Sequence, residues 1–341
     1  MEAFTEKLHA LTVHLLAEAD IEVAATEART KSVDSFIGKI QRPDKNYTDP
    51  LAELTDLCGI RIITHYLEDV ERVGDLIRGT LVVDPKRSVD KSEIMDPDRF
   101  GYQSVHYIVS LDETRRTLAE WERFGDLTAE LQVRTVLQHA WAAIDHKLRY
   151  KAMRDVPRPL RRDLFRLSAL FELGDLEFSR LRENMAAQFS EYVESVREGE
   201  LDIAIDRDSL RAYLAAHPVH SRLAELARSK GFRAINLPLD PQAEEHGQEA
   251  LLSILFQLEV RSLRELQEAV EASSSSAGDV LSYVNTASRA VGYKPVANPY
   301  DALIIVLLHQ RRSSIAPELV HSLAYPVELA EAIVLGLLSV G

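Results

Sequence analysis

Leucines recur at helical spacing near the start of the chain, at Leu8, Leu11, Leu15 and Leu16. This period predicts an amphipathic helix over residues 4–28. Further along, short β-branched or alternating runs predict three strands, at LCGIRIITHY (57–66), SVHYIVSL (104–111) and AELQVRT (129–135). Helical patterns lie between and after them, over 69–80 and 135–151. Strands interleaved with helices predict a mixed α/β domain around one sheet, over residues 1–158.

After residue 158 strand patterns become scarce, and leucine- and alanine-rich helical periods continue to the end of the chain. We therefore expect a second, mainly α-helical region over 159–341. A serine run and several prolines indicate its inter-helix loops. These breaks lie at Ser273 to Ser276 and at Pro218, Pro238, Pro241, Pro295 and Pro299. The apolar helices near the end, 302–310 and 328–338, fit either a core or the assembly surface of a homo-oligomer.

The helical region contains a faint internal similarity. SLRAYLAA (209–216) followed by KGF (230–232) resembles SLRELQEA (262–269) followed by VGY (291–293). Two such copies about 55 residues apart would fit a duplicated helical unit. Chance similarity between alanine- and leucine-rich helices is the simpler explanation.

Composition is that of an ordinary soluble protein. Of the 341 residues, 46% are hydrophobic and 28% charged, and no uninterrupted apolar run approaches the roughly 18 residues of a membrane span. The first twenty residues contain acidic side chains and an amphipathic period, where a signal peptide would have a basic start. We expect a cytoplasmic protein.

Charge and cysteine content narrow the chemistry further. Cys58, the single cysteine, lies in an apolar strand, which predicts a buried structural thiol and excludes an internal disulfide. A net charge of −14 argues against unspecific nucleic-acid binding. A basic run over 147–166 fits either a solvated helix surface or a contact with phosphate or RNA.

Three segments carry side chains suited to phosphate chemistry. In RTKSVDSFIGK (29–39), Lys31, Ser35 and Lys39 are spaced by four, so one helix face would offer two ammonium groups and a hydroxyl to a polyphosphate. The same pattern also occurs on exposed helices. Asp56 precedes an apolar strand that contains Gly59 and Arg61. An aspartate at a strand entrance suits Mg²⁺, and a salt bridge between Asp56 and Arg61 is the structural alternative.

In AELQVRT, alternation places Glu130, Gln132 and Arg134 on one polar strand face. A carboxylate, an amide and a guanidinium together are what phosphoryl transfer requires, although a solvated outer face looks similar. The following helix places His139 and His146 on one side, where each also fits a structural role.

The segment FGYQSVHY (100–107) combines a glycine–tyrosine turn with a strand that presents Ser104 and His106 on the same face. Tyr102 fits a stacking platform for a purine base or a core tyrosine.

Taken in order, these motifs resemble the synthetase domain of the RelA/SpoT homologue family over roughly residues 25–152. The matching patterns are R-x-K-x-x-x-S-x-x-x-K, D-L-x-G-I-R, G-Y-Q-S-x-H and E-L-Q-V-R-T-x-x-Q-H-A-W-A-x-x-x-H-x-L-x-Y-K. The resemblance implies a nucleotidyltransferase-like fold. It also implies transfer of a β,γ-diphosphate from ATP to the 3′-hydroxyl of GTP or GDP, with a stand-alone small-alarmone-synthetase type of domain in front of a helical extension.

The resemblance assigns roles to residues by position. Arg29 and Arg61 would sandwich adenine, while Lys31, Ser35 and Lys39 would bind the phosphates of ATP. Asp56 and Glu130 would hold Mg²⁺, and Glu130 would also help to activate the acceptor hydroxyl. The acceptor nucleotide would be bound by Tyr102, His106, Gln132, Arg134 and His146.

Departures from the family pattern leave alternatives. The acidic segment before the glycine–tyrosine turn lacks the usual lysines, so Lys86, Lys91 or Arg99 would have to hold acceptor phosphates. The acceptor could then be an adenine nucleotide or the 3′ end of tRNA, with the run 147–166 docking the tRNA or a nucleotide effector. The chain has no His-Asp dipeptide, the core of the family's hydrolase module, which predicts synthesis without degradation. From a different class, a non-catalytic nucleotide-binding module would need neither Asp56 nor Glu130.

Overall fold

Alternation along the two central strands divides the sheet of the first unit into an apolar and a polar face. The apolar side chains are buried; they are Cys58, Ile60 and Ile62 of β2 (Cys58–Thr64) and Ala129, Leu131 and Val133 of β6 (Ala129–Thr135). Phe4 and Leu8 of α1 and Val73 and Ile77 of α4 pack against this face. Burial of one aliphatic side chain contributes about 1.5–3 kcal/mol, so this core fixes the sheet and leaves the other face for chemistry.

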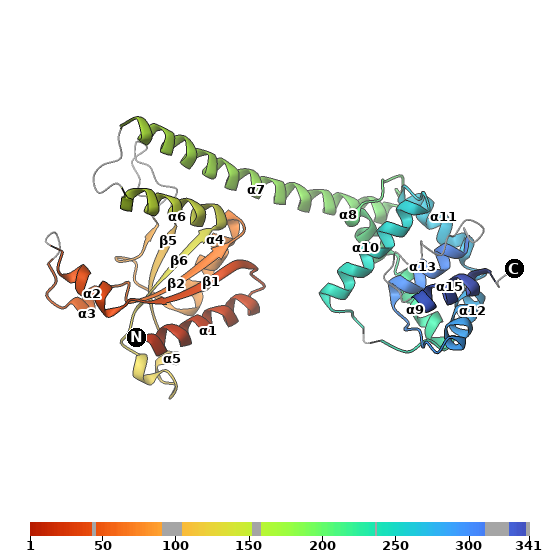
Figure 1. Cartoon of the computed structure of the whole chain (residues 1–341), viewed down its shortest axis with the longest axis horizontal. Coiled ribbons are helices and arrows are strands. Elements are labelled where there is room, and N and C mark those ends of the chain that lie inside the picture. The colour runs from red at the N-terminus through yellow and green to blue at the C-terminus, as the bar shows by residue number, and fades with distance from the viewer. Residues whose placement is uncertain (43–45, 91–103, 152–157, 236, 311–326, 339–341) are drawn as a thin grey trace. The chain divides into compact units, whose positions relative to one another are not determined.

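Figure 1 shows the two compact units of the chain, Met1–Glu183 and Asn184–Gly341. The computed structural model describes residues 1–341 except 43–45, 91–103, 152–157, 236, 311–326 and 339–341. The predicted boundary between 158 and 159 stays a prediction, whereas the compact units divide inside α7 (Arg158–Glu198).

The first unit is built around a six-stranded mixed sheet with the order β1-β2-β6-β5-β3, in which β4 pairs with β5. β2 and β6 are parallel, and the other pairs are antiparallel. The remaining strands are β1 (Val23–Thr30), β3 (Val82–Val83), β4 (Val89–Asp90) and β5 (Val105–Ser110). The helices are α1 (Glu2–Glu18), α2 (Val33–Ile40), α3 (Pro50–Glu53), α4 (Leu67–Thr80), α5 (Glu113–Arg116), α6 (Val136–Lys151) and α7, with a 3-10 turn at Glu122–Phe124. The predicted mixed domain and its three central strands are confirmed.

The helix predicted over 4–28 is wrong after its first half. α1 ends at Glu18, and Asp20 has a positive φ of 50°, which a continuing helix does not allow. Residues 23–30 instead form β1, which pairs antiparallel with β2 from Val23 opposite Thr64 to Thr30 opposite Cys58. Backbone pairing with a buried neighbouring strand overrides the helical propensity of the alanines and glutamates in this segment.

The second unit is mainly helical, as predicted. Its helices are α8 (Arg207–Ala216), α9 (Val219–Ser229), α10 (Pro241–Gln257), α11 (Leu263–Ser273), α12 (Ala277–Ala290), α13 (Pro299–Gln310) and α15 (Val327–Leu338). The apolar segment 302–310 belongs to the core, because Ala302 to Leu308 of α13 are each at most 4% exposed. In α15, Ile333 and Leu337 are buried while Leu335 is exposed. No helix in the described part of the chain is long and apolar enough to span a membrane.

The internal similarity of the second unit coincides with similar local structure in the two copies, which favours the alternative of a duplicated helical unit. α8 and α11 each begin with a capping box, formed by Asp206 with Ser209 and by Ser262 with Glu265. Each second helix is followed by a glycine with positive φ, 94° at Gly231 and 81° at Gly292. The segments that precede α8 and α11 form an antiparallel bridge, and those that follow α9 and α12 form a parallel one. The α8–α9 and α11–α12 segments thus share these local features and are joined by the two bridges.

Polar contacts attach α7 to the first unit. Asp175 is 1% exposed, and its Oδ2 accepts a 2.6 Å hydrogen bond from the hydroxyl of Thr135 at the end of β6. Ser179 donates to Glu68, and Arg182 forms an ion pair with Asp69. Burial raises the pKa of Asp175 to about 7. A carboxylate that loses its proton near neutrality thus lies between α7 and the strand that carries Glu130.

We predict that stability of the first unit falls as pH rises from about 4 to about 7 because of Asp175. The unfolded carboxyl ionises near pH 4, whereas the native one keeps its proton up to about pH 7; the unfolded state therefore binds fewer protons in this window. Asp175→Asn keeps an oxygen acceptor for Thr135 and removes the charge. We expect its free energy of unfolding to exceed that of the wild type by an amount that grows by on the order of 2 kcal/mol between pH 5 and pH 8.

Urea unfolding followed by tryptophan fluorescence measures this difference, since both tryptophans, Trp121 and Trp141, lie in the first unit. Asp163→Asn is the matched control, because Asp163 is an exposed carboxylate on the same helix that pairs with Arg166. Parallel stability curves for wild type and Asp175→Asn across this pH range would contradict the prediction.

Candidate functional site

A cavity of about 450 Å³ opens on the polar face of the sheet. Strand register builds it, because residues opposite each other on neighbouring strands point to the same face. One row across the sheet contains Arg29, Gly59 and Glu130, and the next contains Glu27, Arg61, Gln132 and His106. The first six of these residues line the cavity together with Ala28, Lys31, Asp56 and Ile60. Residues that are far apart in the sequence thus form one polar surface.

Asp56 lies at the end of this cavity, between two lysines. Lys31 Nζ and Lys39 Nζ donate to the same carboxylate oxygen, Asp56 Oδ2, at 2.7 and 2.8 Å. The expectation that Lys31, Ser35 and Lys39 share a helix face is wrong for Lys31. Ser32 caps the N-terminus of α2, so Lys31 precedes the helix and its backbone N–H bonds to Leu57 O beside the sheet. The junction between β1 and α2 therefore brings the two ammonium groups to the same carboxylate oxygen.

The environment of Asp56 favours the charged carboxylate. Burial works to raise its pKa, but hydrogen bonds and charges from Lys31 and Lys39 outweigh burial and hold the pKa below its ordinary value. The second oxygen, Asp56 Oδ1, is buried and has no hydrogen-bond partner within the described chain. Such an unsatisfied buried acceptor is costly, and its position marks where a ligand would bind.

Glu130 is held by a chain of side chains across the sheet. His106 Nδ1 lies 2.7 Å from Glu130 Oε1, and Gln132 Nε2 donates to Oε2 at 3.0 Å. Ser104 Oγ lies 2.8 Å from the other imidazole nitrogen. Burial pushes the pKa of Glu130 up, while the hydrogen bond and charge of His106, followed by Gln132, bring it below its ordinary value. The predicted shared face of Ser104 and His106 is confirmed.

Arg61 pairs with Glu27, and the sequence-based alternative of a salt bridge to Asp56 is wrong. The guanidinium donates from Nη1 to Glu27 Oε2, across the pairing of β1 with β2. Glu27 lines the cavity, and the motifs in the sequence did not identify it. The signal was its spacing of two before Arg29, which becomes informative only when residues 23–30 are known to form a strand.

A group of cations lies farther along the same face. Arg134 is 7% exposed, and burial, followed by the charge of Arg61, lowers its pKa to about 10. Burial, Arg134 and Arg61 also lower the pKa of His139, while Glu27 opposes this shift in both residues. Arg61 Nε, Arg134 Nε and His139 Nδ1 are buried without hydrogen-bond partners within the described residues. The arrangement leaves unused donors at this end of the site.

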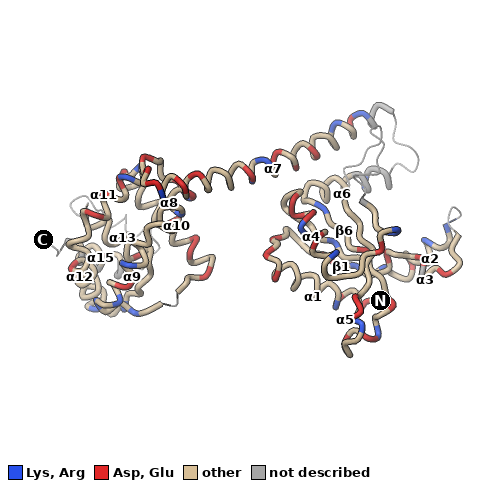
Figure 2. Tube along the Cα trace, turned by 180° about the vertical axis from the view of Figure 1, so that it is seen from behind, with Lys and Arg blue, Asp and Glu red and all other residues tan. Residues whose placement is uncertain are grey.

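Several predicted residues are not brought into the cavity by the described structure. Ser35 lies in the first turn of α2, where its hydroxyl accepts from Ser32 Oγ at 2.8 Å. Tyr102, Lys91 and Arg99 lie outside the described residues, as does the side chain of His146. In the basic run 147–166, Lys147, Arg162 and Arg166 are exposed, and Figure 2 shows acidic and basic residues interspersed along α7. A nucleic-acid contact for this run stays a prediction.

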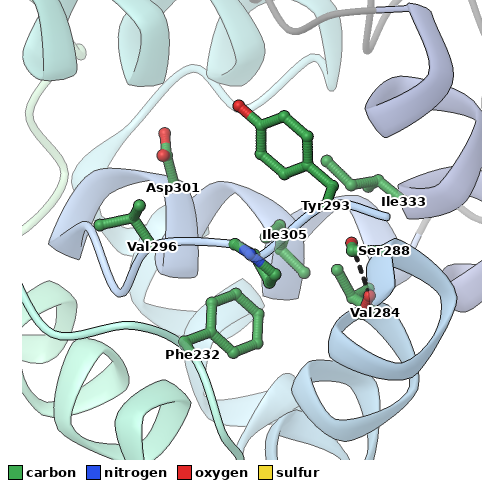
Figure 3. A pocket seen from close by; sticks show the side chains of 9 residues that line it. Phe232, Val284, Ser288, Tyr293, Val296, Asp301, Ile305 and Ile333 are labelled. Atoms are coloured by element: carbon green, nitrogen blue, oxygen red, sulfur yellow. Dashed lines mark hydrogen bonds between the residues drawn. The ribbon is translucent and has the colours of Figure 1, made fainter. Parts of the chain in front are cut away.

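A second cavity, of about 90 Å³, lies inside the second unit (Figure 3). Phe232 and Tyr293, the residues after the two repeat glycines, extend into its lining from different segments. Ser288 already donates its hydroxyl to Val284 O at 2.7 Å. The cavity is small and mostly apolar, so it has the character of a packing defect between the two repeats.

The donor set around the first cavity suits a hard cation only in part. No group of three or more histidine, cysteine, aspartate or glutamate side chains among the described residues could hold a metal ion by itself. Mg²⁺ typically takes one or two carboxylates and completes its shell with water and substrate phosphates. The free buried oxygen of Asp56, beside Glu130, fits that incomplete type of site.

The charges on this sheet face suit a polyanionic ligand, and the face belongs to a mixed α/β domain. Residues 28–155 match the family described as "Region found in RelA / SpoT proteins". The first unit thus contains a region similar to this family, and the predicted resemblance is confirmed.

Two relatives from Bacillus subtilis (strain 168) share this region. "GTP pyrophosphokinase YwaC" is 29% identical over 141 residues, which cover 41% of this chain and 64% of the relative. "GTP pyrophosphokinase YjbM" is 28% identical over 160 residues, covering 45% of this chain and 69% of the relative. The match to YwaC thus spans less than two thirds of its length.

Two solved structures are also similar. The small alarmone synthetase 1 from Bacillus subtilis aligns with a TM-score of 0.44 at 22% identity, over 55% of this chain and 94% of that chain. The structure of that protein bound to its product pppGpp aligns with a TM-score of 0.45 at 22% identity, over 54% and 94%.

We predict that His106→Ala raises the pKa of Glu130. Without the hydrogen bond and charge of His106, burial becomes the dominant influence on this carboxyl and favours its neutral form. Carbon-13 NMR titration of the glutamate side-chain carboxyls measures the shift, with Glu130→Gln assigning the resonance. Ser104→Ala, which touches only the far nitrogen of the imidazole, should shift it less. An unchanged Glu130 pKa in His106→Ala would contradict the electrostatic coupling.

Proposed function

We propose that the first unit is a pyrophosphokinase that transfers the β,γ-diphosphate of ATP to the 3′-hydroxyl of GTP or GDP, yielding pppGpp or ppGpp and AMP. The observation that carries this proposal is the convergence of Lys31 and Lys39 on Asp56, in a cavity whose wall also contains Glu130. Two ammonium groups beside a carboxylate with a free oxygen suit a metal-bound polyphosphate. The match to the RelA/SpoT region supports this nucleotide chemistry.

The donor nucleotide would lie along β1. Lys31 and Lys39 would exchange their bonds to Asp56 for phosphate oxygens, and Ser35 at the start of α2 would add a hydroxyl and the N-terminal end of the helix dipole. Arg29 and Arg61, which both line the cavity, would face the adenine ring. Gly59, which pairs with Arg29, adds no side chain to this part of the cavity wall. An added Cβ there would lie 3.5 Å from Arg29 O, at ordinary contact distance.

Asp56, through its free oxygen, and Glu130 would hold Mg²⁺. When bound, the cation neutralises charge on the transferred phosphates. The oxygen of the acceptor 3′-hydroxyl attacks the β-phosphorus, and the bond from that phosphorus to the oxygen bridging the α-phosphate breaks, so that AMP leaves. Glu130 is ionised at neutral pH because its pKa lies below the ordinary value, and it would accept the hydroxyl proton.

The acceptor would lie on the side of β5 and β6. His106 and Gln132 lie opposite each other on β5 and β6, and they form hydrogen bonds to the two oxygens of Glu130. Arg134, with its buried unpaired Nε, would direct charge toward the acceptor phosphates. Tyr102 would stack on the guanine and His146 would assist it, as the family resemblance implies.

We predict that Asp56→Asn and Glu130→Gln each reduce transfer at least about a hundredfold, because each removes a charge on which the transition state depends. The measurement is product analysis with β-labelled ATP and Mg²⁺, offering GDP, GTP, ATP and deacylated tRNA as separate acceptors. Asp75→Asn removes an exposed carboxylate of α4 and serves as the matched control with unchanged turnover.

Label in guanosine tetra- or pentaphosphate that disappears in both variants would support the proposal. Label in an adenosine product or in tRNA would retain the transfer chemistry and overturn the guanine acceptor. Nucleotide binding by the wild type without transfer to any acceptor would overturn the enzymatic assignment in favour of a binding module.

A further inference from the structure

Glu27 is the carboxylate of the cavity wall that no motif accounts for. It lies on β1, opposite Arg61 and two residues before Arg29, so the three side chains belong to the same sheet face. All three line the cavity. The side chain of Glu27 is 49% exposed, whereas that of Lys31 is 13% exposed. Glu27 therefore offers much of its carboxylate to the open space beside the two arginines.

The position of Glu27 along the strand gives it a place relative to a bound nucleotide. Lys31 and Asp56 mark the phosphate end of the cavity, and four residues of extended chain separate Lys31 from Glu27, or about 13 Å. Arg29 lies between these ends, and Arg61 lies opposite Glu27 on β2. A nucleotide with its polyphosphate at Lys31 and its base between the arginines directs the far edge of the base toward Glu27.

The surroundings of Glu27 are otherwise positive. Its negative charge acts on Arg134 and His139 as well as on Arg61, with which it forms an ion pair. Bound phosphates would repel a carboxylate at the Lys31 end of the cavity. At the other end, the ion pair with Arg61 holds the Glu27 carboxylate in place. A carboxylate accepts hydrogen bonds and cannot donate them. It therefore favours a base edge that carries an N–H donor.

We propose that Glu27 is a specificity-determining residue that accepts a hydrogen bond from the exocyclic amine of the donor's adenine. The inference rests on the proposed donor site. Adenine carries an N6 amine, where guanine in the same orientation carries the O6 acceptor. A carboxylate placed before O6 would face its lone pairs without a donor between them, which disfavours GTP as the diphosphate donor.

A thermodynamic cycle between Glu27 and the amine tests this inference. Calorimetry would measure the Kd of ATP and of purine riboside 5′-triphosphate, which lacks only the amine, for the wild type and for Glu27→Ala and Glu27→Gln. We expect the wild type to bind ATP about tenfold more tightly than the deaminated analogue, and Glu27→Ala to bind both alike. Glu27→Gln retains an acceptor oxygen and should retain part of the preference. Glu22→Ala, at an exposed acid just before β1, is the control.

Equal weakening of both ligands by Glu27→Ala would overturn the inference, because it would mean that Glu27 only positions Arg61. A Glu27→Ala variant that binds both ligands as tightly as the wild type does would overturn it as well, because the carboxylate would then contribute nothing to the preference. The cycle measures binding alone, so its result can be interpreted even if the wild-type protein binds ATP without transferring a diphosphate. That outcome would overturn the proposed function and leave the inference about Glu27 standing or falling by the ratio.

Discussion

The parallel pairing of β2 with β6 determines which side chains of the first unit face each other. It aligns Gly59 with Glu130 and Arg61 with Gln132, while the intervening residues bury the apolar core. Because the side-chain period of a strand is two, a slip of one residue would place Glu130 in the core and Leu131 in the cavity. The buried face thus specifies the register, and the register assembles the site. Stability and chemistry depend on the same pairing.

Polar partners then refine what the register brings together. Glu130 has a hydrogen bond to each carboxylate oxygen, while Asp56 has two bonds to one oxygen and, among the described residues, none to the other. The two carboxylates are both ionised for different reasons: a histidine and an amide stabilise one, and two lysines stabilise the other. This difference suits Glu130 to act on a neighbouring group and Asp56 to receive a new ligand.

Sequence patterns predicted three central strands of the sheet but missed the edge strand β1. The runs around Ile60, Tyr107 and Leu131 are alternating or rich in β-branched residues, and all three form strands. VAATEART carries no such pattern, because β1 is mostly exposed and pairs with a single neighbouring strand. Missing β1 also concealed Glu27 and misplaced Lys31. Residues set by backbone pairing between distant segments leave little trace in local periodicity.

The repeat in the second unit shows a related limit. Leucines and alanines in the two copies are too common to distinguish duplication from chance. The stronger evidence is the conformation at matching positions, namely the capping boxes before α8 and α11 and the left-handed glycines Gly231 and Gly292. These positions are constrained by backbone geometry, so different residues, Asp206 with Ser209 and Ser262 with Glu265, fulfil the same role.

The ion pairs of Asp56 have a consequence for how a ligand enters. Lys31 and Lys39 neutralise the charge of the Asp56 carboxylate, and the carboxylate neutralises theirs. A lone divalent cation would displace two ammonium groups without offering them new partners, whereas a cation arriving with a polyphosphate supplies oxygens to both. On the proposed function, binding would therefore exchange one set of counterions for another, and the site would favour the complete metal–nucleotide complex over either component alone.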